Sequence, residues 1–409
     1  MIRLLAPVSP LLLGVAILLT GQGLQGTLLP VRAGLEGFST FSIGLMGGAY
    51  FLGFTLGCLR GVALVQRVGY VRTFAAMTAA ASAAPLLHGL WLDDWVWWIL
   101  RLVSGFCFAV LYVVIESWLN EKSTNENRGA VFSAYTLITL TVLAVGQQML
   151  LLYDPQRMAL FAIASALVSL AALPVVLSTA ATPSHEQTKV RLNLRRLYTI
   201  SPAGVLGCLA CGLANGTFWS LAPVFVAGYS ADVSLVAWFM TATVLGGALG
   251  QYPLGLWSDR VDRRYVIAFA AFAGTAIGMT MWYMSAGIST LQLMLLGAAW
   301  GAIAFPMYAV SVAHTNDYAQ ADEYVMISSG LLLMYGIGAI LGPFLAPAVM
   351  ALIGTGGLYI FTAAVHLLLG LYIIFRITRR KPVPDEEQIP FVDALASTQT
   401  ASNVYEEEF

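Results

Sequence analysis

The chain has 409 residues, of which 59% are hydrophobic and only 10% are charged, and its formal net charge is −1. Soluble domains carry about 25% charged residues, so this composition excludes an ordinary soluble protein and indicates a surface that faces lipid. No block of basic residues indicates a nucleic acid as a partner.

Apolar stretches of about 20 residues, the length that a helix needs to cross a bilayer, recur along the chain. The first begins after Arg3 and lacks the small-residue cleavage pattern of a signal peptide, so we expect it to be retained as a helix. The predicted fold is all-α, with twelve membrane-spanning helices. Their ranges are 8–30, 40–64, 73–92, 95–119, 129–153, 157–179, 203–227, 233–257, 265–285, 289–315, 325–351 and 354–376.

Lysine and arginine are unevenly distributed between the two sides of these spans. With both termini in the cytoplasm, fifteen basic residues fall in cytoplasmic segments, and only Arg32 and Arg157 fall in external loops. Because cytoplasmic loops of membrane proteins carry an excess of lysine and arginine, this bias predicts cytoplasmic termini. We expect a multi-pass protein of the bacterial inner membrane.

A polar segment at 180–202 interrupts the apolar pattern and divides the chain into two halves, 1–179 and 203–376. We expect this linker to be cytoplasmic and to contain a short basic helix. The polar tail 377–409 is expected to be cytoplasmic and disordered, because it holds too few apolar residues to fold.

The two halves repeat each other. Matching residues lie 193 positions apart in the first helices of each half and 196 apart further on: Gly53 and Gly246, Gly57 and Gly250, Tyr112 and Tyr308, Asn120 and Asn316. Because each repeat contains six spans, the halves share one orientation and are related by an axis along the membrane normal. The sequence therefore predicts two pseudo-symmetric six-helix bundles.

The densest group of charges lies in the turn between the eighth and ninth spans, in the run Gly255-Leu-Trp-Ser-Asp259-Arg260-Val-Asp-Arg263-Arg264. A weaker copy follows the second span. We expect an inner gate at these turns, with Asp317 near an arginine of the second turn, and Glu121 or Glu116 near an arginine of the first. The gate candidates are Arg67, Arg72, Glu121, Asp259, Arg260, Arg263 and Asp317.

These motifs resemble those of the major facilitator superfamily, and the resemblance covers essentially all twelve spans. The charged turn is similar to the hallmark loop between the second and third helices of a half, and Arg101-Leu-Val-Ser-Gly105 is similar to the motif of the fourth helix. The runs Val113-Val-Ile-Glu-Ser117 and Gly250-Gln-Tyr-Pro-Leu-Gly255 resemble the uncharacterised bacterial YcaD-type permeases. The resemblance implies a substrate site near the midplane, between two bundles that rock.

The sequence departs from the family pattern in two places. The first-half turn has Val65 and Gln66 where the family has an aspartate, which puts its charge relay in doubt. The fifth helix has Gly146-Gln147-Gln148 instead of the Gly-Pro element of drug–proton antiporters. This difference weighs against multidrug efflux.

Two charged residues lie within the fourth span. Arg101 is about 9 Å inside its outer boundary, where a guanidinium is costly unless it faces protein or water. It either anchors a substrate anion or a proton-carrying partner, or it reaches back to the interface or to helix carbonyls. Glu116, about 22 Å further along, is either the proton-coupling carboxylate or a gate partner of Arg60 or Arg67.

Uncharged polar and aromatic residues inside the spans complete the substrate-binding candidates. Buried amides need hydrogen-bond partners, so these side chains either contact a ligand or join helices. Together with Arg101 the candidates are Gln22, Gln25, Tyr112, Asn215, Trp219, Trp300 and Tyr308. We interpret His314 and His366 as packing residues.

No set of residues has the spacing of a metal site, a nucleophile with its base, or a phosphate-binding glycine loop. The cysteines Cys58, Cys107, Cys208 and Cys211 all fall inside spans, where packing explains them. We therefore expect no cofactor, no metal and no enzymatic activity.

The sequence predicts a secondary active transporter of a small organic solute, coupled to protons and working as a monomer in the lipid bilayer. Its partners would be the solute and the proton. One alternative is a multidrug or metabolite efflux antiporter. Another is a non-transporting receptor or assembly factor on a transporter scaffold.

Overall fold

The computed structural model describes residues 8–123, 128–177, 193–230, 232–284, 287–320, 323–379, 388 and 391, and in these ranges the chain is helical. The first half contains α2 (Ser9–Leu35), α3 (Thr40–Val68), α4 (Tyr70–Leu90), α5 (Asp94–Lys122), α6 (Arg128–Gln148), η2 (Met149–Leu151), α7 (Ala159–Leu170) and α8 (Ala172–Val176). After α9 (Leu194–Ile200), the second half contains α10 (Pro202–Ala227), α11 (Val233–Ser258), α12 (Arg263–Tyr283), α13 (Thr290–Ala304), α14 (Pro306–Asn316), α15 (Tyr324–Ile353) and α16 (Gly357–Ile377).

The observed helices follow the predicted spans to within a few residues. Three spans are each divided, 129–153 into α6 and η2, 157–179 into α7 and α8, and 289–315 into α13 and α14, where Pro306 begins the second piece. Eleven spans in the described chain are long and apolar enough to cross a membrane. The remaining predicted span is α4, which contains Arg72, His88 and several hydroxyl residues and is therefore less apolar, although its 21 residues reach about 31 Å.

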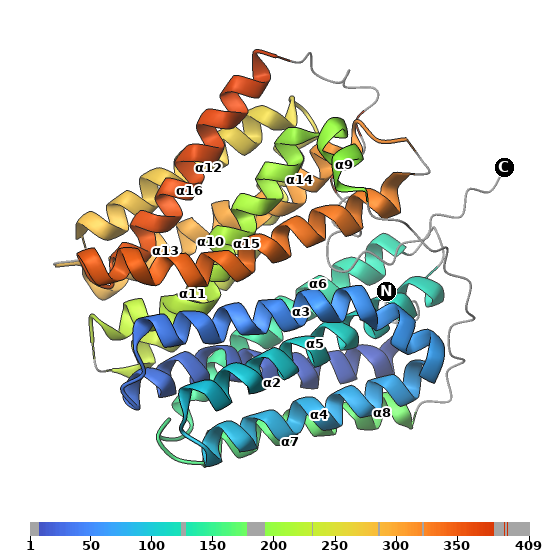
Figure 1. The fold of residues 1–409 in the computed structure, drawn as a ribbon, viewed down its shortest axis with the longest axis vertical. Helices are drawn as coiled ribbons and strands as arrows, with labels where there is room; N and C mark the ends of the chain where they lie inside the picture. Colours follow the sequence, from blue (N-terminus) through green and yellow to red (C-terminus); the bar gives the residue numbers. More distant parts are fainter. Residues whose placement is uncertain are drawn as a thin grey trace.

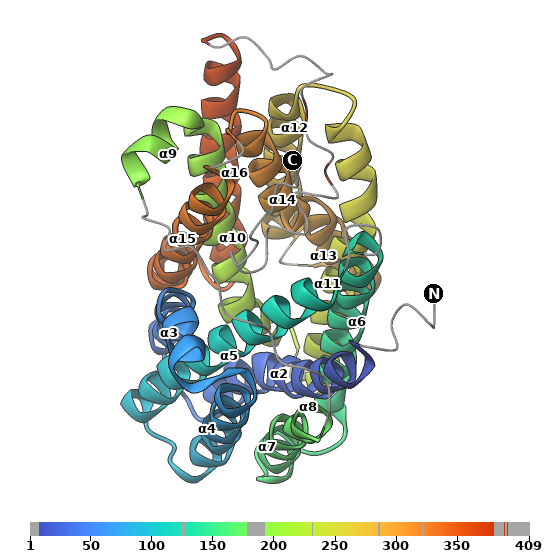
Figure 2. The same cartoon turned by 90° about the vertical axis from the view of Figure 1, so that its right-hand side faces the viewer.

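Each half is built in the same way. In the first half α3 packs on α5 and α2 packs on α6, and in the second half their repeat mates pack in the same pairs, α11 on α13 and α10 on α15. Seen from the side of the termini, α4, α7 and α8 lie at the edge of the first half that is remote from the second (Figure 2). The observed packing therefore has the pseudo-symmetry that the sequence repeat predicts.

Glycines allow the closest helix crossings. In the crossing of α3 and α5, a Cβ at Gly53 would overlap the carbonyl of Leu102, and one at Gly105 would overlap the carbonyl of Tyr50. Small residues let two membrane helices approach backbone to backbone. Gly301, the repeat mate of Gly105, meets a backbone carbonyl of α11 in the same way.

Replacing Gly105 with alanine is expected to lower the thermal stability of the purified protein, because the added methyl group would force α3 and α5 apart. Overpacking of this kind costs about 1–3 kcal/mol. The matched control is Gly26→Ala in α2, where a Cβ would meet nothing within 4 Å and alanine favours the helix. Equal melting temperatures for the two variants would contradict this account of the crossing.

The two halves meet at one end of the molecule and diverge toward the other, where α2 and α15 begin (Figure 1). We call these ends the opposite face and the terminal face. Near the opposite face the rings of Phe41 and Phe344 lie 5.6 Å apart, and Gln148 donates a hydrogen bond of 2.8 Å to Thr241. Close packing between α3 and α15 extends to Gly336, at about the middle of α15.

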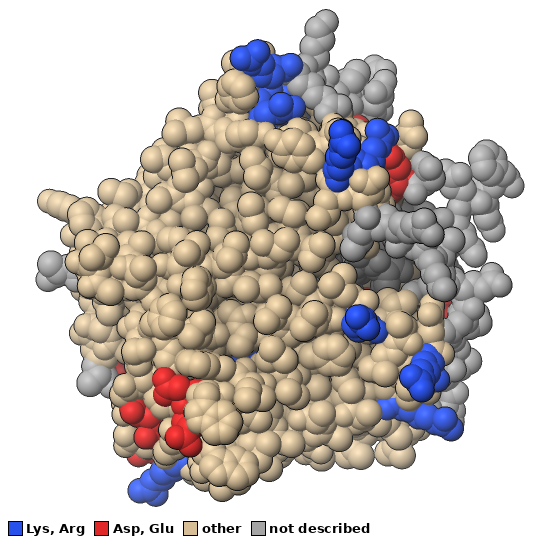
Figure 3. Space-filling model, in the orientation of Figure 1, with Lys and Arg blue, Asp and Glu red and all other residues tan. Residues whose placement is uncertain are grey.

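Charged side chains are segregated on the surface. On the side shown in Figure 3, most lysine and arginine side chains lie toward the terminal face, a group of acidic side chains with a basic neighbour lies at the opposite face, and the surface between them is almost entirely uncharged. An uncharged band between two charged ends is typical of a protein that lies in a bilayer.

The expected basic helix of the linker is present as α9. Asn193 caps its first turn by accepting a hydrogen bond from the Arg196 backbone N–H at 3.0 Å, and the Arg196 side chain pairs with Glu323, just before α15, at 2.7 Å. Residues 180–192 of the linker lie outside the described residues. The pair holds α9 against the second half.

The Arg196–Glu323 pair is expected to make a small contribution to stability that depends on pH. The hydrogen bond from Arg196 outweighs partial burial and holds the pKa of Glu323 below its usual value. A lowered pKa stabilises the folded protein above the unfolded pKa of about 4.3, and this stabilisation is lost as the pH falls through the folded pKa. Because half of Arg196 is exposed, we expect less than about 1 kcal/mol.

Thermal melting of the wild type and Glu323→Gln at pH 7 and pH 3 checks this expectation. The variant should melt slightly earlier at pH 7 and together with the wild type at pH 3. A difference that persists at pH 3 would mean that the substitution acts through something other than the ion pair.

Candidate functional site

A chain of polar contacts joins three helices of the first half near their middles. The amide nitrogen of Gln22 on α2 donates to the Tyr50 hydroxyl on α3 at 2.8 Å. The Tyr112 hydroxyl on α5 donates to the amide oxygen of the same Gln22 at 3.0 Å. The structure thus brings two predicted candidates, Gln22 and Tyr112, into direct contact. It adds Tyr50, a tyrosine that the sequence did not single out, as a second partner of Gln22.

Arg101 lies at one end of this chain of contacts. Its guanidinium carbon is 4.0 Å from the centre of the Tyr50 ring, a cation–π contact. Its Nε is buried and has no hydrogen-bond partner among the described residues. Buried donors are nearly always paired, and arginine keeps its charge. The site therefore contains a buried donor that has no partner among the described residues.

Glu116 lies one turn beyond Tyr112 on the same face of α5. It is buried, with 4% of its surface exposed. The hydroxyl of Tyr135 on α6 donates to its carboxylate at 3.3 Å. The alternative partners, Arg60 and Arg67, are exposed and form no ion pair within the described chain. The geometry therefore does not support a bridge from Glu116 to either arginine.

The second half repeats part of this arrangement without its charge. Asn215 lies 193 positions after Gln22, and Tyr308 lies 196 after Tyr112. Tyr308 packs against the Tyr335 ring at 5.0 Å, and the Asn215 Oδ1 is buried without a partner in the described part of the chain. The position that matches Arg101 is a glycine. An amide and a tyrosine thus occur in each half, and the cation in only one.

The other aromatic and amide candidates differ in their surroundings. Trp219 remains partly exposed and stacks on Phe305, with ring centres 5.6 Å apart. Trp300 is fully buried and stacks on Phe218 at 5.0 Å, so the structure places it in the core of the second half instead of at the site. Gln25 is 2% exposed, and neither amide atom has a partner in the described ranges.

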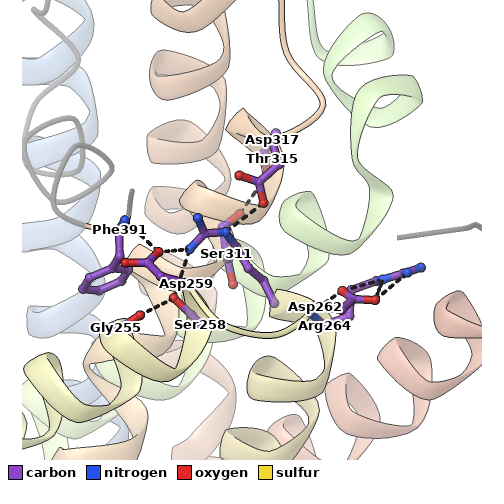
Figure 4. Close-up of polar contacts among 10 residues, drawn as sticks. Gly255, Ser258, Asp259, Asp262, Arg264, Ser311, Thr315, Asp317 and Phe391 are labelled. Carbon is purple, nitrogen blue, oxygen red and sulfur yellow. Dashed lines mark hydrogen bonds and ion pairs between the residues drawn. The ribbon is translucent and has the colours of Figure 1, made fainter. Parts of the chain in front are cut away.

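A second polar cluster lies at the terminal face of the second half (Figure 4). Arg263, 1% exposed, pairs through Nε with Asp317 at 2.7 Å and through Nη1 with Asp259 at 3.1 Å. The predicted contact of Asp317 with an arginine of this turn is therefore confirmed. Arg264 instead pairs with Asp262, and Arg260 is exposed.

In the described part of the first half there is no equivalent of this cluster. Gln66 and Tyr70 occupy the positions that match Asp259 and Arg263. The side chains of Arg67 and Arg72 are exposed, and within the described ranges neither forms an ion pair, so the structure does not bring them to Glu121 or Glu116. The loss of the acid and the arginine from this turn explains the difference.

Known proteins share this sequence pattern and architecture. The profile of the Major Facilitator Superfamily matches residues 11–203 and 204–404. An uncharacterised MFS-type transporter of Enterobacter sp. (strain 638) is 28% identical over 381 residues, which cover 92% of this chain and 97% of the relative. The uncharacterised MFS-type transporter YcaD of Escherichia fergusonii is 28% identical over 376 residues, 90% of this chain and 95% of the relative.

Solved transporter structures have the same fold. The nucleoside transporter NupG superposes with a TM-score of 0.74 at 14% identity, over 92% of this chain and all of that chain. A bacterial homologue of the human lysosomal transporter Spinster, in an inward-facing and occupied conformation, gives 0.73 at 15% identity, over 93% of this chain and 98% of that chain.

Proposed function

We propose that this chain is a proton-coupled secondary transporter of a small organic anion. The chain belongs to the Major Facilitator Superfamily and is therefore a multi-pass membrane transporter rather than an enzyme. The observation that carries the proposal is Arg101, a permanent cation with an unused buried donor among membrane helices. Within the described ranges, the guanidinium lies over the Tyr50 ring and forms no ion pair with an acidic side chain. An anionic ligand would supply the missing acceptor.

The substrate site in this proposal lies between the halves, at the level of the two amide–tyrosine pairs. Arg101 binds a carboxylate or phosphate group of the solute, since its planar fork matches two acceptor oxygens. Gln22 and Tyr112 from one half, and Asn215 and Tyr308 from the other, offer donors and acceptors to the rest of the solute. Trp219 adds an apolar surface.

Proton coupling is assigned to Glu116. A carboxylate among apolar helices is favoured in its neutral form, and the Tyr135 hydroxyl donates a hydrogen bond to it at 3.3 Å. Access from one side and then from the other lets such a group take up and release a proton. Tyr112, one turn away on α5, links this carboxylate to the substrate end of the site.

The conformation fits one stage of alternating access. If the terminal face is cytoplasmic, as the lysine and arginine distribution predicts, contact at the opposite face and divergence at the terminal face correspond to an inward-facing state. Rocking of one half against the other would reverse these contacts. We place the protein in the bacterial inner membrane as a monomer.

A ligand screen tests the proposal directly. Purified protein is melted in the presence of a metabolite library at two pH values, because a ligand that binds the folded state raises its apparent stability. Small organic anions are expected to stabilise it, and the best of them to be accumulated by proteoliposomes under a proton gradient. Stabilisation by lipophilic cations alone would favour the efflux antiporter instead. Stabilisation by none of these solutes would count against transport of a small organic anion.

A further inference from the structure

Phe391 is distant from the bundle in sequence, yet its side chain is buried against α11. It follows the last residue of α16, Ile377, by fourteen positions, and 3% of its surface is exposed. It belongs to the apolar cluster of the second half that also contains Leu254 and Val310. The expectation of a disordered tail does not hold at this residue, because the bundle provides an apolar site for its ring.

Phe391 is received by Gly255 in the last turn of α11 and by Asp259, which directly follows the helix. Gly255 has no side chain, and a Cβ at this position would overlap the Phe391 ring. One turn further on, the Asp259 carboxylate accepts a hydrogen bond from the Phe391 backbone N–H at 2.9 Å (Figure 4). The same oxygen accepts a hydrogen bond from Arg263 at 3.1 Å. The tail is therefore tied to the charge cluster of the second half by both its ring and its backbone.

Phe391 lies on the side of α11 that faces the first half. At the opposite face, α11 meets the first half through Thr241, which bonds to Gln147 and Gln148 of α6. Gly255 follows Thr241 by fourteen positions, close to four full turns at 3.6 residues per turn, so the two residues share nearly one face and lie about 21 Å apart. The face that α6 contacts at one end of α11 carries Phe391 at the other.

We propose that Phe391 is an intramolecular wedge: while its ring lies on Gly255, the terminal ends of the two halves cannot close, and the tail must leave α11 before the transporter opens toward the opposite face. The wedge would thus regulate the alternating access proposed above, on which this inference rests. It acts on the equilibrium between states because the tail binds one state and not the other.

The wedge is tested by the distance between the terminal ends of the halves. Spin labels on non-canonical residues at positions 72 and 265, both exposed, report this distance in the full-length protein. The ratio of short to long distances is expected to rise about tenfold in Phe391→Ala, a shift equivalent to about 1.4 kcal/mol. Removing a buried phenylalanine side chain costs more free energy than this, so only part of that loss is needed to produce the tenfold shift.

Phe409→Ala, which removes the other phenylalanine of the tail, is the matched control and should leave the distances as in the wild type. Unchanged distances in folded Phe391→Ala, or a shift to longer ones, would overturn the proposal. So would an equal shift in Phe409→Ala, because it would assign the effect to the tail in general.

A second measurement keeps the tail in place instead of releasing it. In Gly255→Cys with Phe391→Cys, oxidation is expected to form a disulfide that suppresses the short distances until a reductant is added. The proposal fails if no disulfide forms, or if oxidised and reduced proteins sample short distances equally. Neither readout needs a substrate: a protein that moves no solute but shows these shifts would reject the proposed function and retain the wedge. A protein that transports the solute but shows no change in these distances when Phe391 is replaced would retain the proposed function and reject the wedge.

Discussion

Replacing Arg101 with alanine is expected to abolish transport and to weaken anion binding by about 100-fold or more while the protein remains folded. Two hydrogen bonds from a charged group, each worth about 1.5–3 kcal/mol, account for a loss of this size, since 1.4 kcal/mol is tenfold. Affinity measured by thermal shift on intact purified protein, with the anion found in the screen, checks this expectation.

Arg101→Lys sharpens this test. Lysine keeps the charge but replaces the planar fork with a point charge, so most of the affinity should still be lost. The matched control is Arg72→Lys, an exposed arginine on the same half, which should bind as the wild type does. Wild-type affinity in Arg101→Ala would assign the residue to structure, with the Tyr50 ring as its permanent partner.

Glu116→Gln is expected to separate solute movement from the proton gradient. Glutamine fits the same space and can still bond to Tyr135, but it cannot take up or release a proton. In proteoliposomes the variant should exchange solute across the membrane at a rate close to that of the wild type, yet lose accumulation driven by a pH gradient. The physical reason is that, in the proposed mechanism, Glu116 is the group that carries the coupled proton across the membrane.

The control is Glu121→Gln, a change of the same chemistry on the same helix but at an exposed position. This variant should accumulate solute as the wild type does. Undiminished accumulation by Glu116→Gln would remove Glu116 from the coupling mechanism and direct attention to Asp317 or His314.

Local sequence patterns were sufficient for the all-helical, two-half architecture and for the contact of Asp317 with the charged turn, but they did not predict the surroundings of Arg67 and Arg72 in the first half. Arg101 is visible in the sequence because a permanent cation inside an apolar span is rare and costly. The contact of Asp317 with the charged turn followed from the repeat, since its mate Glu121 ends the corresponding helix of the first half. Such residues carry their own signal, whatever packs around them.

The residues that the sequence analysis missed have no local signal. Tyr50 and Tyr135 are ordinary tyrosines in apolar helices, and their importance depends on Gln22 and Glu116 on other helices. Trp300 shows the opposite error: the sequence analysis listed it as a substrate-binding candidate, but in the structure its ring stacks on Phe218 in the core of the second half. Phe391 lies in a polar tail, and only the position of Gly255 in space explains its burial.

The seal between the halves at the opposite face consists of uncharged groups. It joins glycine to proline at Gly44 and Pro343, ring to ring at Phe41 and Phe344, and amide to hydroxyl at Gln148. Acid and salt act on charges and therefore have little hold on such contacts. If that face is external, this seal is insensitive to changes of pH and salt in the medium around the cell. The buried charge cluster and Phe391 lie instead at the terminal face, toward the better-buffered cell interior.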